Sequence, residues 1–143
     1  MSYRFLEKVS IADVAFEAEA KTLTGLFGEA ARAVLAIQIQ NPEALKIKQT
    51  ALIKVSHKTP NLLLYRFLQE IIFLKHKRRW LLVPHHVTIS ESPDGYDLEG
   101  YMEGELIDPS RHDQKADVKA VTLPMLEVSQ TSEGWKATVV VEV

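Results

Sequence analysis

The segment of residues 108–122, DPSRHDQKADVKAVT, gathers six charged side chains and one histidine before the chain becomes apolar. Carboxylate, guanidinium, ammonium and imidazole groups can transfer protons, bind phosphate or pair with an oppositely charged partner. The composition is typical of a loop that leads into a strand. Four interpretations are open at this point: a catalytic loop, a nucleic-acid patch, a solvated connector and a docking surface for a partner.

Enzymatic chemistry has weak support from the motifs. Ser110 and His112 suggest a nucleophile and a base, but no nucleophile elbow and no glycine-rich oxyanion loop accompany them. A phosphate-binding loop is absent as well. His85 and His86 are consecutive residues of an expected strand, so their side chains point to opposite faces and are not arranged to chelate one ion.

Two acidic residues near the ends of the chain form a second group of interest. Asp13 begins an alternating apolar run, and Glu142 lies within the final apolar stretch TVVVEV. Because burying an unpaired carboxylate is costly, Glu142 either faces water at a sheet edge or has a partner. Spacing alone does not link it to Asp13, since the two acids lie at opposite ends of the sequence.

Composition limits the class of protein. The 143 residues, 46% hydrophobic and 25% charged, predict a single globular domain over residues 1–143. The net charge of −2 argues against a strongly basic nucleic-acid binder. The segment KHKRRW at residues 75–80 is either a local RNA patch or, as we favour, a solvated helix end. The absence of cysteine excludes disulfides, thiolate zinc sites and a cysteine nucleophile.

No apolar run approaches the roughly 18–20 residues that span a bilayer, and the first residues lack the apolar core of a signal peptide. We therefore expect a cytoplasmic protein that does not contact the membrane.

Hydrophobic periodicity predicts the order of the elements. Alternation predicts strands over residues 13–20 and 45–57, and apolar residues at helical spacing predict helices that follow Thr22 and Thr59, which act as caps. Further strands are expected at residues 80–92, 96–106, 117–130 and 135–143. The chain should therefore belong to the α/β class in its α+β form, with a mixed β-sheet and two α-helices packed on one face.

The segment of residues 104–128 resembles the archease family. That family has a Gly-Glu pair followed by Asp-Pro-x-Arg-His-x-x-Lys-x-x-Val-Lys-Ala-Val-Thr ahead of a late strand. The matching residues are Gly104, Glu105, Asp108, Pro109, Arg111, His112, Lys115, Val118, Lys119, Ala120, Val121 and Thr122.

The resemblance extends over nearly the whole chain. The family's N-terminal motif, His-Thr-Ala-Asp-hydrophobic-Gly ahead of a Glu, is matched by Ala12, Asp13 and Glu17. The chain departs from this motif at three positions: Ser10, Ile11 and Ala15 replace the family's His, Thr and Gly. The family's penultimate Asp is replaced by Glu142. Leu123 and Pro124 stand where the family often has Tyr-His.

The resemblance implies a small accessory protein that is not itself an enzyme. Archeases speed the guanylylation of a tRNA-splicing RNA ligase and let it turn over repeatedly, so the implied partner is that ligase, with an indirect link to tRNA. The family binds a divalent metal ion, usually calcium, and the matching ligands here are Asp13, Glu142 and the Val143 main chain. Magnesium is the alternative ion, because Glu is one methylene longer than Asp.

The charged segment then becomes an exposed functional loop beside the metal site. The residues expected to contact the ligase, its nucleotide or its RNA are Arg111, His112, Lys115 and Lys119. We expect a monomer. Two alternatives stay open: a chaperone-like or protein-binding module on the same fold with other partners, and a metal hydrolase that uses His112 and acidic residues.

Overall fold

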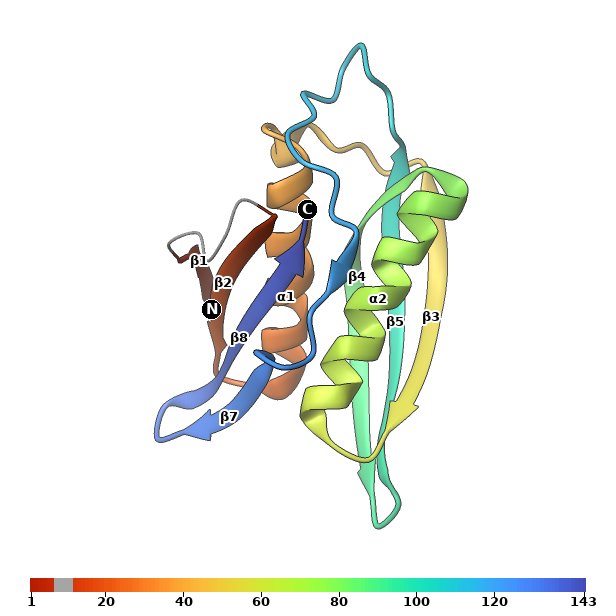
Figure 1. Ribbon diagram of the computed structural model, residues 1–143. Coiled ribbons are helices and arrows are strands. Elements are labelled where there is room, and N and C mark those ends of the chain that lie inside the picture. Colours follow the sequence, from red (N-terminus) through yellow and green to blue (C-terminus); the bar gives the residue numbers. More distant parts are fainter. Residues whose placement is uncertain (7–11) are drawn as a thin grey trace.

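The computed structural model describes residues 1–6 and 12–143, which form two helices and two β-sheets (Figure 1). The helices are α1 (Leu23–Gln38) and α2 (Pro60–Arg78), with a short 3-10 helix at Pro42–Ala44. The strands are β1 (Ser2–Phe5), β2 (Asp13–Ala20), β3 (Gln49–His57), β4 (Trp80–Ser92), β5 (Gly95–Leu106), β6 (Ala120–Val121), β7 (Glu127–Thr131) and β8 (Gly134–Glu142). The larger sheet has the order β1-β2-β8-β6, with β7 also paired to β8, and the smaller sheet has the order β3-β5-β4.

Both helices begin as the sequence predicts. The Thr22 hydroxyl accepts a hydrogen bond from the Gly25 N–H at 3.0 Å, and the Thr59 hydroxyl accepts one from the Leu62 N–H at 3.3 Å. These side chains satisfy N–H groups that have no partner inside the helix. Pro60 follows Thr59 as the first residue of α2, where its missing N–H costs nothing.

The core lies between the helices and the sheets. Helix α1 lies behind β2 and β8, and α2 lies in front of β4, β5 and β3 (Figure 1). Phe27 of α1 and Phe67 of α2 are both fully buried and stack with their ring centroids 5.9 Å apart, so the two helices share one core.

The α+β class and the two helices are confirmed, but the arrangement of the strands corrects the expected one. All strand pairs are antiparallel, and the strands divide into two sheets instead of one mixed sheet. Helix α1 packs against strands of both sheets, and α2 packs mainly against β3 and β4. Alternation identifies a strand without identifying its neighbour, because pairing depends on residues far apart in sequence. The strand expected over residues 117–130 is also divided, into β6 and β7, with Pro124 between them.

None of the helices in the described residues has the length and hydropathy that a membrane crossing requires.

Gly104 allows β5 to pass close to β4. A β-carbon added at Gly104 would overlap the Leu81 carbonyl oxygen, so only glycine fits at this point of the strand pair. The next residue, Glu105, is directed to the opposite side of the sheet from Gly104. Gly104 therefore helps to set the position of a carboxylate that is central to the site described below.

Candidate functional site

The two acidic residues from the ends of the sequence lie directly opposite each other in the larger sheet. Strands β2 and β8 are antiparallel, and their register pairs Asp13 with Glu142. Opposite residues of an antiparallel pair have side chains on the same face and β-carbons about 4.5–5.5 Å apart. The Val143 N–H donates to the Ala12 carbonyl at 2.8 Å, which continues the pairing beyond the end of β8. The register thus places the two implied ligands opposite each other, and their binding of an ion stays a prediction.

The atom types at this pair of strand ends suit a hard divalent cation. Two carboxylates and the Val143 main-chain carbonyl are oxygen donors, the type that calcium and magnesium prefer. Among residues 1–6 and 12–143 no three His, Asp or Glu side chains lie close enough together to hold a metal ion, so main-chain carbonyls and water would have to complete the coordination of an ion at Asp13 and Glu142. Ser10 and Ile11, which replace motif residues of the resembled family, lie outside the described residues.

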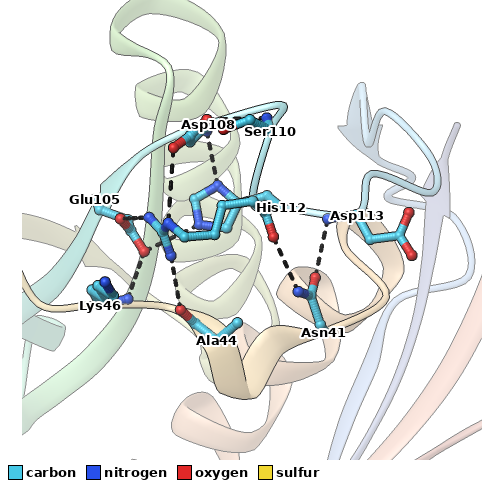
Figure 2. Close-up of polar contacts among 9 residues, drawn as sticks. Asn41, Ala44, Lys46, Glu105, Asp108, Ser110, His112 and Asp113 are labelled. Atoms are coloured by element: carbon cyan, nitrogen blue, oxygen red, sulfur yellow. Dashed lines mark hydrogen bonds and ion pairs between the residues drawn. The ribbon is translucent and has the colours of Figure 1, made fainter.

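The charged segment is built around a buried carboxylate (Figure 2). Glu105, at the end of β5, is only 2% exposed. One of its oxygens, Oε1, accepts a hydrogen bond from the Arg111 guanidinium. The other, Oε2, accepts from the Lys46 N–H at 2.6 Å and lies 3.1 Å from His112 Nε2. Both oxygens of Glu105 are thus occupied by donors.

Burial alone would raise the pKa of Glu105. Hydrogen bonds from Arg111, from the Lys46 N–H and from His112 outweigh this effect and lower the pKa from 4.5 to about 2. Glu105 is therefore an ionised acceptor across the whole neutral range and cannot act there as a proton donor. Its charge is neutralised locally by Arg111.

His112 is held in one tautomer. Its Nδ1 accepts from the Asp108 backbone N–H at 2.8 Å, so Nδ1 carries no proton. The proton is then on Nε2, which donates to Glu105. Because the side chain is fully buried and both ring nitrogens are engaged, His112 is not placed to act as the base of a hydrolase.

The same segment is fastened to the end of α1. The Asn41 amide donates to the Arg111 carbonyl at 3.2 Å, and its Oδ1 accepts from the Asp113 N–H at 3.1 Å. The Lys115 N–H donates to the Gln38 carbonyl at 2.8 Å. Figure 2 shows Asn41 between His112 and Asp113, so the amide bridges helix and loop. This charged segment is an ordered loop and not a solvated connector.

The four residues predicted to contact a partner are therefore not equivalent. Lys115 and Lys119 are exposed, and the Arg111 side chain is 28% exposed while bound to Glu105. His112 is 2% exposed, which corrects its expected place on the surface: the Glu105 carboxylate and the Asp108 N–H hold the ring inside. Contact of the other three with a partner stays a prediction.

Sequence reasoning matched Glu105 to a motif but assigned it no role. The local pattern gave no signal for such a role: four buried residues of β5 alternate up to Gly104, and Glu105 falls on the other face of the strand. That face would be expected to be solvated. In the structure, residues 44–46 and the charged loop lie over this face of β5 at Glu105. No local sequence pattern predicts this contact between distant segments.

The chain was compared with known proteins. The model of the archease protein family matches residues 3–143. Protein archease of Methanosarcina acetivorans is 31% identical over 144 residues, covering 99% of this chain and 95% of that protein. Protein archease of Pyrococcus abyssi is 26% identical over 133 residues, covering 92% of this chain and 93% of that protein.

A solved structure agrees with these matches. The solution structure of Methanobacterium thermoautotrophicum protein 1598 superimposes with a TM-score of 0.81 at 26% sequence identity, covering 99% of this chain and 98% of that one. The family resemblance in the loop motif and the predicted accessory, non-enzymatic role agree with these findings. From the family match over nearly its whole length, we conclude that this chain belongs to the archease family.

Proposed function

We propose that this chain activates a GTP-dependent tRNA-splicing RNA ligase, promoting guanylylation of the ligase and its multiple turnover. Family membership supports an accessory role, and the ligase as partner follows from what the family resemblance implies. The connection with tRNA is then indirect, through the ligase. The proposal includes a divalent cation, calcium or magnesium, bound by this chain.

The observation that carries the metal part of the proposal is the pairing of Asp13 with Glu142. Two carboxylates on one face of adjacent strands repel each other, and a bound cation would offset that repulsion while fixing the strand ends. The ligands would be the carboxylates of Asp13 and Glu142 and the main-chain carbonyl of Val143. The charged loop reaches the same place, since the Lys119 N–H donates to the Glu142 carbonyl at 2.7 Å.

The exposed cations of the loop would provide the contact with the ligase. Lys115 and Lys119 lie on the same ordered loop as the Glu105–Arg111–His112 network, which holds the loop in one conformation. A preorganised loop loses less conformational entropy on binding than a flexible one. In this proposal the buried network positions the loop and the two lysines meet the partner.

The test is multiple-turnover RNA ligation by the ligase from the same cell, with this protein added well below ligase stoichiometry. Wild-type protein should sustain turnover, and Asp13→Ala should abolish that effect. Glu19→Ala is the matched control, because Glu19 is an exposed acid on the same strand but lies opposite Lys136, away from Glu142. The control should behave as wild type.

A lack of any effect on an active ligase would overturn the proposal. Stoichiometric binding to unrelated proteins without a ligase effect would instead favour the alternative of a chaperone-like or protein-binding module. Equal activation by wild type and Asp13→Ala would support the ligase role but show that a metal at Asp13 is not needed for it.

A further inference from the structure

A cavity of about 410 Å³ lies where the β4–β5 hairpin, the β7–β8 hairpin and the start of α1 come together. We call it the hairpin cavity, and the residues that line it include Leu23, Ile89, Glu91, Tyr96, Gln130 and Trp135. Figure 1 shows both hairpins at the lower end of the molecule, away from the C-terminus. The cavity is therefore separate from the strand ends that carry Glu142. Its volume falls within the range of small-molecule pockets.

Each hairpin contributes one aromatic ring and one side-chain acceptor to the cavity. In the β4–β5 hairpin Glu91 lies directly opposite Tyr96, and in the β7–β8 hairpin Gln130 lies directly opposite Trp135. Opposite residues of antiparallel strands have their side chains on the same face. The two registers therefore bring two rings and two acceptors to one space, although the hairpins belong to different sheets.

The two rings are held in place by the hydrophobic core. Tyr96 and Trp135 are partly buried and pack against the main cluster of buried residues, and both also border the cavity. A ring in such a place can hold a cation over its face, where the potential is negative. Because the core already fixes the rings, they lose little conformational entropy when a ligand binds.

The charge of the cavity is negative. Among the described residues that line it, Glu91 is the only charged one, and none is a lysine or an arginine. The Tyr96 hydroxyl donates to Glu91 Oε1 over a long distance of 3.4 Å. Burial and the charge of Glu91 raise the pKa of Tyr96, so this hydroxyl stays protonated as a donor. A carboxylate beside two rings, without a cation of its own, favours a cationic ligand.

We propose that the hairpin cavity binds a guanidinium group, as carried by an arginine side chain. The cation lies against the rings of Tyr96 and Trp135 and donates to the Glu91 carboxylate. The side-chain oxygen of Gln130 accepts a further hydrogen bond. Guanidinium fits better than ammonium because it is planar, is weakly hydrated and carries several N–H donors in a fixed arrangement. The proposal goes beyond ligase activation and does not depend on it, because binding is measured on this protein alone.

The experiment is a titration of ¹⁵N-labelled protein with Nα-acetylarginine amide, followed by NMR. The indole N–H of Trp135 should show saturable shifts with a dissociation constant on the order of millimolar. The indole of Trp80, which does not line the cavity, is the internal reference. The citrulline compound has nearly the same shape without the charge, and the lysine compound has the charge without the planar group. Each should bind at least about fivefold more weakly.

Glu91→Gln should weaken binding of the arginine compound about tenfold or more, because it removes the charge and keeps the size of the side chain. Glu133→Gln is the matched control. Glu133 is an exposed acid in the turn of the β7–β8 hairpin that does not line the cavity, so its loss should leave the affinity unchanged. Both acids are exposed, and circular dichroism checks that both variants fold.

Two further ligands separate the sources of the group. Tighter binding of an acetylated Gly-Arg-Gly amide than of methylguanidinium would assign the site to an arginine of a protein partner, and equal binding would assign it to a free guanidinium compound. Three results would overturn the proposal: no saturable shift of the Trp135 indole at tens of millimolar ligand, equal binding of the citrulline or lysine compound, or equal weakening by Glu91→Gln and Glu133→Gln.

Discussion

Replacing Glu105 with glutamine should destabilise the fold far more than the small change in structure suggests. Oε1 accepts from Arg111, and Oε2 accepts from the Lys46 N–H and from His112. Whichever way the new amide is oriented, its NH₂ group faces a donor. The substitution also removes the charge that neutralises Arg111, whose side chain is 28% exposed.

Two routes to the magnitude agree. The difference between a pKa of 4.5 in the unfolded chain and about 2 in the folded protein corresponds to roughly 3 kcal/mol of stability. Loss of charge-assisted hydrogen bonds around a partly buried cation gives roughly 2–4 kcal/mol. We therefore expect Glu105→Gln to lower the free energy of unfolding by about 2–4 kcal/mol near neutral pH.

The pH dependence follows from the direction of the shift. The folded pKa of Glu105 lies below its unfolded value, so its stabilisation is complete above about pH 4.5 and is lost as the pH falls from about 4.5 towards 2. Protonation makes the wild-type residue neutral, like glutamine. The difference in stability between wild type and Glu105→Gln should therefore shrink across this window.

The difference in stability between wild type and Glu105→Gln can be measured by urea denaturation at neutral pH and at several acidic pH values. Unfolding is followed by the fluorescence of Trp80 and Trp135. Glu99→Gln is the matched control, because Glu99 lies on the same strand and its carboxylate is 45% exposed, 3.4 Å from Lys54. An exposed ion pair of this kind contributes about 0–1 kcal/mol. Equal destabilisation by the two substitutions, or a Glu105→Gln effect that does not change with pH, would refute the reasoning.

Three further perturbations probe other parts of the molecule. Chelator should lower the melting temperature of the wild type but hardly that of Asp13→Ala, as read by differential scanning fluorimetry; equal sensitivity would remove the metal site. Gly104→Ala should cost several kcal/mol in chemical denaturation, because the methyl group meets the Leu81 carbonyl oxygen; a near-neutral result would show that the strand pair can separate without loss. Lys115→Glu should weaken ligase binding without unfolding the domain, with affinity and circular dichroism as the two measurements; unchanged affinity would place the partner elsewhere.

Local patterns in the sequence determined most of the secondary structure. Alternation over residues 13–20 predicted β2, and the strand expected at residues 80–92 is β4, both with the observed bounds. Thr22 and Thr59 marked the starts of both helices. These signals are reliable because side-chain periodicity and helix capping depend on residues only a few positions apart. The loop motif of residues 104–122 likewise identified the family, because its residue order is specific.

Only the tertiary structure decided which groups meet. The division into two sheets, the pairing of Asp13 with Glu142 and the cover over Glu105 all join residues that are distant in sequence. His112 shows the consequence most clearly: within a highly charged segment it would be expected at the surface, yet Glu105 and the Asp108 N–H hold it in the interior. A polar side chain can be buried when its hydrogen bonds are completed, and whether they are completed depends on packing between segments that no local pattern describes.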